Sequence, residues 1–387
     1  MALKSGTMTY YGLTTPQTTG SVKMDLDPII RSTDPTELPL KEYIGYNGFT
    51  FTNMKFEILE KNHAPIQDSI GVATNWNNSS IADLPVTDAS AFCVGDIIQT
   101  IRNETLIVNT VDEANNDISV IARADLGSIE STAHVAADVI YIIGSALTEG
   151  WTPGSQFRYN EPARKYNYGE EFVRDVIITD RMKNTAQYGI TDPFTNELID
   201  QTLVINKLLE QMALYGGGQA EDGTNPSTTE GVMGTTTVIG STTNKTNEAG
   251  VSITLDKVMD GMQLIYNQGG NGQFTIMLPP YQKRQLSAEL NPYRRDNMVN
   301  TKFKQILDTI ECDFGMANVL MNRYMRSDDC LIFKKENFMI GNLQNSAFAL
   351  EKWARTAKKD FGTVSGIYGV KFLNEEHSSW LWNFATS

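Results

Sequence analysis

The sequence has few of the residues that carry most catalytic and metal chemistry. Its 387 residues include only three cysteines and three histidines, and each of these stands far from the others along the chain. Such spacing makes neither a disulfide framework nor a CxxC metal site, and isolated histidines supply neither a Ser-His-Asp triad nor a zinc site. We therefore predict no catalytic residue, no cofactor and no bound metal. The residues concerned are Cys93, Cys312, Cys330, His63, His134 and His377.

Long apolar runs are also missing. The longest, Val139–Ile143, is broken at Gly144, whereas a membrane helix needs about 20 consecutive apolar residues. The opening residues Met1–Thr7 lack the apolar core of a secretory signal. We therefore expect a protein that does not contact a membrane.

Basic residues are fewer than acidic residues. The chain has 32 Lys and Arg against 46 Asp and Glu, so its net charge is 32 − 46 = −14. A protein that wraps nucleic acid needs a broad basic surface that releases counterions, and this composition excludes one. Hydrophobic residues make up 41% of the chain, which is enough for packed cores and excludes a wholly disordered protein.

β-type patterns dominate the first half of the chain after a Thr-, Pro- and Gly-rich segment at 1–50. That segment shows no lasting period and indicates an extended arm, with one short helix at Asp27–Arg31. A strand is expected at Phe51–Leu59. Between 84 and 147, β-branched runs flank turn residues such as Glu113–Asp117, which predicts a small inserted β module.

The strongest helix signal begins at Asp192. This aspartate can cap a helix whose first residue is Pro193, and apolar residues then recur at helical spacing until Gly216. We predict a rod of roughly 30 Å or more at 1.5 Å per residue. The apolar residues that mark this helix include Leu198, Leu203, Leu208 and Met212.

An alternation of helices and strands follows this rod. A second helix is expected from Thr254, a strand at Phe274–Leu278 and a third helix from Pro279. Strand patterns then continue to Phe384. This order predicts an α+β protein with helices beside sheets.

A basic and aromatic stretch at 158–168 interrupts the acidic sequence. Three interpretations of this stretch are open. Arg and Tyr are enriched as anchors in protein interfaces, and interleaved Arg and Tyr can also stack on single-stranded nucleic acid. The third interpretation is a simple solvated loop. In a chain of net charge −14, the acidic surface of another copy is the favoured partner. We therefore predict an intersubunit interface, on what we expect to be a long projecting hairpin. Its residues are Arg158, Tyr159, Arg164, Lys165, Tyr166 and Tyr168.

The remaining motifs favour structural interpretations. Glu170–Glu171 and Asp328–Asp329 are adjacent carboxylates, which on a strand face opposite ways and cannot act as a general acid and base. Asp313–Gly315 spells the metal-binding triplet of protein kinases, but the accompanying kinase motifs are missing, so a turn between strands is expected.

This succession of arm, basic hairpin, long helix, α/β body and terminal strands resembles the major capsid protein of tailed double-stranded-DNA bacteriophages. That family has the Hong Kong 97-type fold, and Val94–Ile98, Ile118–Ile121, Ala146–Gly150 and Tyr188–Leu209 resemble its subgroup with a small β insertion before the extended loop, or E-loop. The resemblance implies an α+β capsid fold with an axial (A) domain, a peripheral (P) domain and a long spine helix. The implied parts are an N-terminal arm at 1–50, a P-domain strand and linker at 51–83, the β insertion at 84–147, the E-loop at 148–178, the P-domain spine helix at 179–216, the A domain at 217–342, and the P-domain long strands with the C-terminal segment at 343–387.

The resemblance also implies the function. Copies would form hexamers and pentamers of an icosahedral head that encloses DNA as cargo, in the virion after assembly in the host cytoplasm. A separate scaffolding protein, a portal and a decoration protein are the implied partners besides the chain itself. The alternatives are another virion component, such as a tail-tube or decoration protein, and a hydrolase that uses carboxylates on an α/β body.

Overall fold

The structure, a computed structural model, describes residues 36–386 except 47, 62, 64, 73, 76–79, 102, 123–132, 146–148, 151–160, 186–191, 235–243, 291–308, 356 and 357. The chain divides into two compact units. Unit 1 comprises Met1–Ile58 with Lys165–Ser387, and unit 2 comprises Leu59–Arg164. The expected arm and its helix at Asp27–Arg31 lie almost entirely outside the described residues.

Unit 1 contains a mixed sheet covered by a long helix. The strand order is β1-β18-β20-β12, with β19 also paired to β20. The 10 residues of β12 run antiparallel to β20, from Glu170 opposite Tyr368 to Thr179 opposite Lys359. The strands are β1 (Thr50–Phe51), β12 (Glu170–Thr179), β18 (Phe338–Leu343), β19 (Ala349–Lys352) and β20 (Lys359–Phe372).

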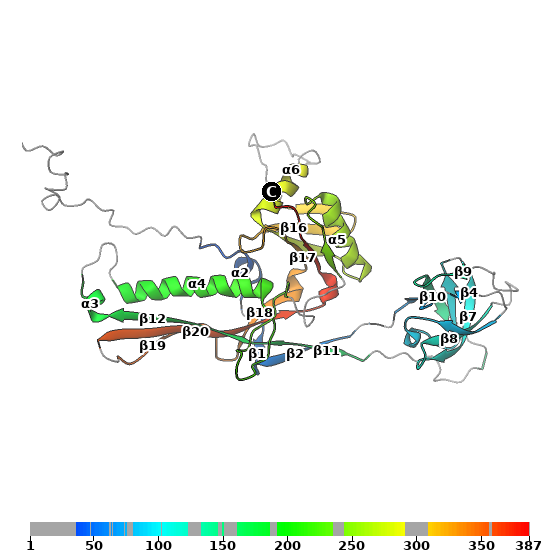
Figure 1. Ribbon diagram of the computed structural model, residues 1–387, viewed down its shortest axis with the longest axis horizontal. Helices are drawn as coiled ribbons and strands as arrows, with labels where there is room; N and C mark the ends of the chain where they lie inside the picture. The colour runs from blue at the N-terminus through cyan, green and yellow to red at the C-terminus, as the bar shows by residue number, and fades with distance from the viewer. Residues whose placement is uncertain are drawn as a thin grey trace, which may run out of the picture. The chain divides into compact units, whose positions relative to one another are not determined.

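The long helix is α4 (Pro193–Tyr215), and the predicted start and stop are both confirmed. The Asp192 carboxylate accepts a hydrogen bond from the Phe194 amide at 3.1 Å, Pro193 opens the helix, and Gly216 ends it. Its 23 residues span about 35 Å. Leu198 and Met212 are buried, whereas Leu203 and Leu208 are half-buried. Figure 1 shows α4 lying along β12, β19 and β20.

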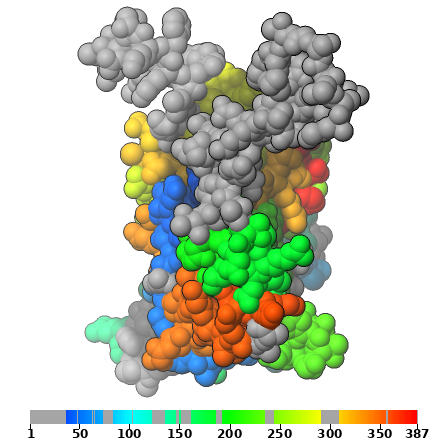
Figure 2. All heavy atoms as spheres, turned by 90° about the vertical axis from the view of Figure 1, so that its left-hand side faces the viewer, coloured from blue at the N-terminus to red at the C-terminus, as the bar shows by residue number. Residues whose placement is uncertain are grey.

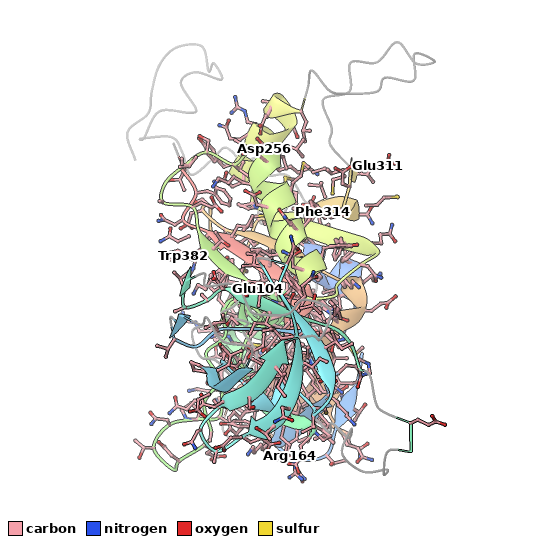
Figure 3. The ribbon with its side chains drawn as sticks, turned by 90° about the vertical axis from the view of Figure 1, so that its right-hand side faces the viewer. Glu104, Arg164, Asp256, Glu311, Phe314 and Trp382 are labelled. Carbon is pink, nitrogen blue, oxygen red and sulfur yellow. The ribbon has the colours of Figure 1, made fainter. Side chains whose placement is uncertain are left out.

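A second sheet of unit 1 has the order β13-β21-β17-β14-β16-β15. Its central strand β14 has buried side chains on both faces, because Met277 joins the core beneath α4 while Ile276 joins the core beneath α5. The elements are β13 (Lys245–Asn247), β14 (Gln273–Leu278), β15 (Thr309–Cys312), β16 (Gly315–Met321), β17 (Cys330–Phe333), β21 (Ser379–Trp382), α5 (Leu255–Asn267) and α6 (Pro280–Glu289). Asp313 and Phe314 form the expected turn between β15 and β16, and the Phe314 ring lies 5.8 Å from that of Tyr266 (Figure 3).

Strand pairing differs from expectation at three places. β11 (Ala163–Tyr168) pairs with β2 (Lys55–Glu60), and β12 pairs with β20, so these strands do not form the expected self-paired hairpin within 148–178. β18, expected mostly in the A domain, belongs to the first sheet, and β21, expected with the terminal P-domain strands, belongs to the second. Local patterns identify a strand but carry no information on which distant strand it meets.

Unit 2 is a small antiparallel barrel. Its sheet has the order β3-β10-β6-β7-β8-β5. The two end strands meet at a bridge between Ile70 and Val86, where the Gly71 amide donates to the Pro85 carbonyl at 2.9 Å and closes the ring. The strands are β3 (Gln67–Ser69), β5 (Ser80–Pro85), β6 (Asp96–Thr100), β7 (Thr105–Asp112), β8 (Asp117–Ala122) and β10 (Val139–Ser145), with a separate pair β4 (Thr74–Asn75) and β9 (Ala133–His134).

The barrel has its own core. Ile98, Leu106, Val120 and Ile140 point inward and are fully or almost fully buried. The unit begins before the predicted insertion at 84–147, because the first strands of the barrel precede residue 84.

The shorter elements complete the secondary structure. Two short helices, α2 (Pro39–Ile44) and α3 (Asp180–Lys183), belong to unit 1. The 3-10 turns are Ala89–Ala91, Lys335–Asn337 and Glu375–His377.

Candidate assembly surfaces

The predicted interface stretch forms one strand of the β2–β11 ribbon. Arg158 and Tyr159 lie outside the described residues. Arg164 is exposed, whereas the Lys165 ammonium lies 2.7 Å from the Glu375 carboxylate of the same chain. Lys165 is thus held within its own chain, so among the described cations of this stretch Arg164 is the one most open to a partner.

The two tyrosines of the stretch share one side of β11. Residues two apart on a strand face the same way, and the rings of Tyr166 and Tyr168 meet edge to face at 5.7 Å. The Lys55 ammonium of β2 lies 4.1 Å from the centre of the Tyr166 ring. Tyr166 remains 36% exposed, so its outer surface is open to a partner.

Asn167, between these tyrosines, is a buried polar junction that the sequence patterns did not reveal. Its Nδ2 donates to the carbonyls of Glu230 at 3.1 Å and Val370 at 2.7 Å. Its Oδ1 accepts from the amides of Glu230 at 2.9 Å and Tyr168 at 2.8 Å. One side chain therefore joins β11, the segment that follows α4, and β20.

A second buried junction ties the base of the N-terminal segment to α4. Glu210 is fully buried, and its Oε1 accepts from the Leu40 amide at 3.0 Å and from Asn322 Nδ2 at 2.9 Å. Tyr43 of α2 also shares a hydrogen bond of 2.6 Å with Thr275. Burial raises the pKa of the Glu210 carboxyl, because the charged form loses its hydration.

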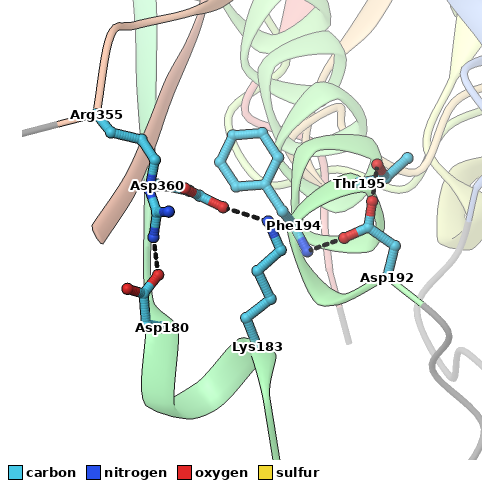
Figure 4. Close-up of polar contacts among 7 residues, drawn as sticks. All are labelled: Asp180, Lys183, Asp192, Phe194, Thr195, Arg355 and Asp360. Carbon is cyan, nitrogen blue, oxygen red and sulfur yellow. Dashed lines mark hydrogen bonds and ion pairs between the residues drawn. The ribbon is translucent and has the colours of Figure 1, made fainter. Parts of the chain in front are cut away.

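An exposed ion network closes the far end of the first sheet (Figure 4). Lys183 donates to Asp360 at 2.6 Å, and Arg355 bridges Asp360 at 2.9 Å and Asp180. The Lys183 hydrogen bond holds the pKa of Asp360 below its usual range. The network links the β19–β20 connection to α3 at the surface.

The paired carboxylates considered for catalysis have structural roles. Glu170 accepts from the Thr229 amide at 3.2 Å, while Glu171 is exposed. Asp329 is buried and accepts from the Tyr215 hydroxyl at 2.7 Å and from Trp380 Nε1 at 3.1 Å. Neither pair places two carboxylates across a cleft, as a carboxylate hydrolase requires.

The described part of the chain lacks two further kinds of functional feature. No group of three or more His, Cys, Asp or Glu side chains there is arranged to hold a metal ion. No helix in the same residues combines the length and apolarity needed to cross a lipid bilayer.

A family model described as SU10 major capsid protein matches residues 7–385. The chain belongs to this capsid family. Its role is therefore structural, as a major capsid protein of a phage virion. This membership, with the observed elements and the inserted barrel, confirms the predicted α+β capsid fold of the Hong Kong 97 type.

Solved structures resemble the chain at low sequence identity. The capsid of a native GTA particle is 10% identical, with a TM-score of 0.48 over 99% of this chain and 100% of that chain. A chain of Mycobacterium phage Bobi is 9% identical, with a TM-score of 0.47 over 99% of this chain and 100% of that chain. One of Mycobacterium phage Ogopogo is 12% identical, with a TM-score of 0.45 over 96% of this chain and 99% of that chain. No curated protein matches the chain.

Family membership decides between the alternatives. A major capsid protein is neither a tail-tube nor a decoration protein, and the long helix α4 with its adjoining sheet suits a shell subunit. Sequence patterns identified α4 and the basic stretch. They missed Asn167 and Glu210, because a single buried polar residue leaves no periodic signal in a sequence.

Proposed function

We propose that copies of this capsid protein assemble into hexamers and pentamers of an icosahedral shell around double-stranded DNA, without catalysis. The observation that carries this proposal is the family match over residues 7–385. Many copies of one kind of chain can close a shell only if they make heterologous contacts that are repeated in slightly different local surroundings. The net charge of −14 keeps the wall from gripping packaged DNA. Assembly takes place in the host cytoplasm, with a separate scaffolding protein, a portal and a decoration protein as partners.

The test of assembly is electron microscopy of the full chain, expressed alone and together with its neighbouring virion genes. We expect closed shells tens of nanometres across. A protein that stays a stable monomer at high concentration under both conditions would overturn the proposal.

We further propose that the β2–β11 ribbon and the residues joined to it act as the E-loop and lie against a neighbouring copy. Arg164 is exposed, and Arg158 belongs to the same basic stretch. In an acidic protein, these cations have an oppositely charged partner in the next copy. The interface residues proposed are Arg158, Tyr159, Arg164, Tyr166 and Tyr168, with Lys165 supporting the ribbon through Glu375.

Charge reversal tests this role without disturbing the Lys165 ion pair. We expect R158E combined with R164E to reduce the assembled fraction strongly while the unfolding curve stays that of the wild type. Glu161→Lys, which changes an exposed residue of the same stretch, is the matched control and should assemble normally. Normal assembly of the double variant would remove the ribbon from the interface.

A further inference from the structure

The outer face of the unit 2 barrel carries a row of apolar side chains. Ile97 of β6 lies opposite Ile107 of β7, and Ile107 lies opposite Ile121 of β8. Cross-strand partners share one face of a sheet, and this face is the reverse of the one that buries Ile98 and Leu106. The row is therefore outside the barrel.

The row continues onto the next strand. Gly144 of β10 lies opposite Ile97, and the neighbouring Ile143 and Tyr141 are 54% and 43% exposed, while Ile121 is 42% exposed. We call Ile97, Ile107, Ile121, Tyr141 and Ile143 the apolar row. A solvated barrel face would alternate polar residues at these positions, so a continuous apolar row indicates a surface that another molecule covers.

The unit that carries this row is acidic. Residues 59–164 contain five Lys or Arg against fourteen Asp or Glu, a net charge of −9, whereas the remaining residues contain 27 against 32, a net charge of −5. Asp112 and Asp117 lie opposite each other at the end of the β7–β8 hairpin, on the same face as Ile107 and Ile121. Two such barrels would repel each other, so the partner of the row is not a second barrel.

A surface of opposite charge exists in unit 1. The segment 349–359, which runs from β19 to the start of β20, carries four cations and one anion. We call its residues Leu350, Lys352, Trp353, Arg355, Lys358 and Lys359 the basic tip.

The basic tip combines this charge with exposed apolar area. Trp353 is 55% exposed, and its ring lies 6.1 Å from that of Phe361. Leu350 is 62% exposed on the opposite side of β19. A pocket of about 250 Å³ beside Trp353 is lined by Phe194 and Phe361 together with charged side chains of both signs, namely Lys183, Asp192, Lys352, Arg355 and Asp360. Figure 2 faces this end of unit 1, with the β19–β20 residues in orange below α3 and the start of α4 in green.

Two of the four cations of the basic tip are free for a partner, whereas Lys352 lies 4.9 Å from the centre of the Phe194 ring. Arg355 is engaged by Asp180 and Asp360. Lys358 and Lys359 are exposed, and no described residue forms an ion pair with either of them. The basic tip, with its exposed Trp353, is thus complementary in charge to unit 2, which carries the apolar row.

We propose that the apolar row of one copy docks on the basic tip of a neighbouring copy in the shell. The inference rests on the proposed shell function and extends it, because it gives the inserted barrel a partner. The apolar side chains supply the buried centre of the contact, and the charges at its border steer the copies and fix their register.

A reciprocal charge swap tests the contact. K358E with K359E leaves the Arg355 and Lys183 ion pairs in place, and E113K with D117K changes exposed or half-buried positions at the end of the β7–β8 hairpin. We expect each swap alone to lower the fraction of protein in shells at least about tenfold, because each places like charges together. The four substitutions combined should restore assembly to within about threefold of the wild type.

The outcomes distinguish a failure of the proposed shell function from a failure of the docking proposal. If the wild type forms no shells, the proposed function fails before any variant is compared. If wild-type shells form and both swaps assemble normally, or if the combined variant is worse than either swap, the docking proposal is overturned. Sedimentation and thermal unfolding of each variant check that it is folded.

The apolar part is tested by I121E with I143E, which should also reduce assembly at least about tenfold. Ile199→Glu, which changes an exposed isoleucine on α4 in unit 1, is the matched control and should assemble normally. If I121E with I143E forms normal shells but releases a second virion protein or exposes bound DNA, the row belongs to that partner and the proposal is wrong.

Discussion

The two units of this capsid protein are stabilised in different ways. Unit 2 is a closed barrel whose strands and core all lie within one continuous stretch of sequence, 59–164. Unit 1 joins residues that are distant in sequence: the Asn167 amide reaches Val370, and Glu210 reaches Leu40. Unit 2 is therefore a local insertion, whereas unit 1 depends on buried polar junctions between distant segments.

Asn167→Ala should produce the largest loss of stability. It removes four hydrogen bonds and leaves two carbonyls and two amides without their partner in a buried site, which should cost about 3–5 kcal/mol. Chemical denaturation measures this loss. Asn115→Ala, in the exposed β7–β8 turn of unit 2, is the control and should cost less than about 1 kcal/mol. Equal losses would remove the contrast between the units.

Ile98→Ala tests whether unit 2 unfolds by itself. Ile98 is fully buried in the barrel core, and the cavity should cost about 2–5 kcal/mol. Hydrogen exchange should accelerate at the amides of unit 2 and stay unchanged in unit 1. The matched variant Ile340→Ala, buried in unit 1, should show the reverse. Acceleration throughout the chain in both variants would mean that the units unfold together.

Glu210→Gln should change the pH dependence of unit 1. Burial raises the folded pKa of Glu210 above its unfolded value, so its contribution to stability is complete below the ordinary glutamate pKa and is lost as the pH rises through the raised pKa. The uncharged glutamine keeps an oxygen for Leu40 and Asn322 and should remove this loss. Thermal unfolding from pH 4 to about pH 8 measures the difference; identical slopes in both proteins would contradict it.

Arg355→Gln at the exposed ion network should have the smallest effect. Exposed ion pairs are strongly screened, so the variant should differ from the wild type only slightly at low salt and not at about 1 M salt. The lowered pKa of Asp360 implies stability that is present above the ordinary aspartate pKa and lost as the pH falls through the lowered one. A large effect that persists in high salt would show that this network resembles the buried junctions.

The sequence predicted the elements whose signals are local. The helix α4 was defined at both ends because its cap, its proline, its apolar period and its terminal glycine are all neighbours in the chain. Most barrel strands were also recognised, since β-branched runs and turn residues alternate over short distances. The basic stretch was visible, but its internal Lys165–Glu375 ion pair was not.

The amino-acid sequence alone determined the acidic balance, the shortage of catalytic residues, the long helix and the presence of an inserted β module. Only the tertiary structure decided that β11 pairs with β2, that β21 returns to the second sheet, and that the ring of the barrel closes at Ile70 and Val86. It also placed Asn167 and Glu210 at buried junctions. The reason is physical: helix ends and turns depend on adjacent residues, whereas strand partners and buried hydrogen bonds depend on segments that meet only after the chain has folded.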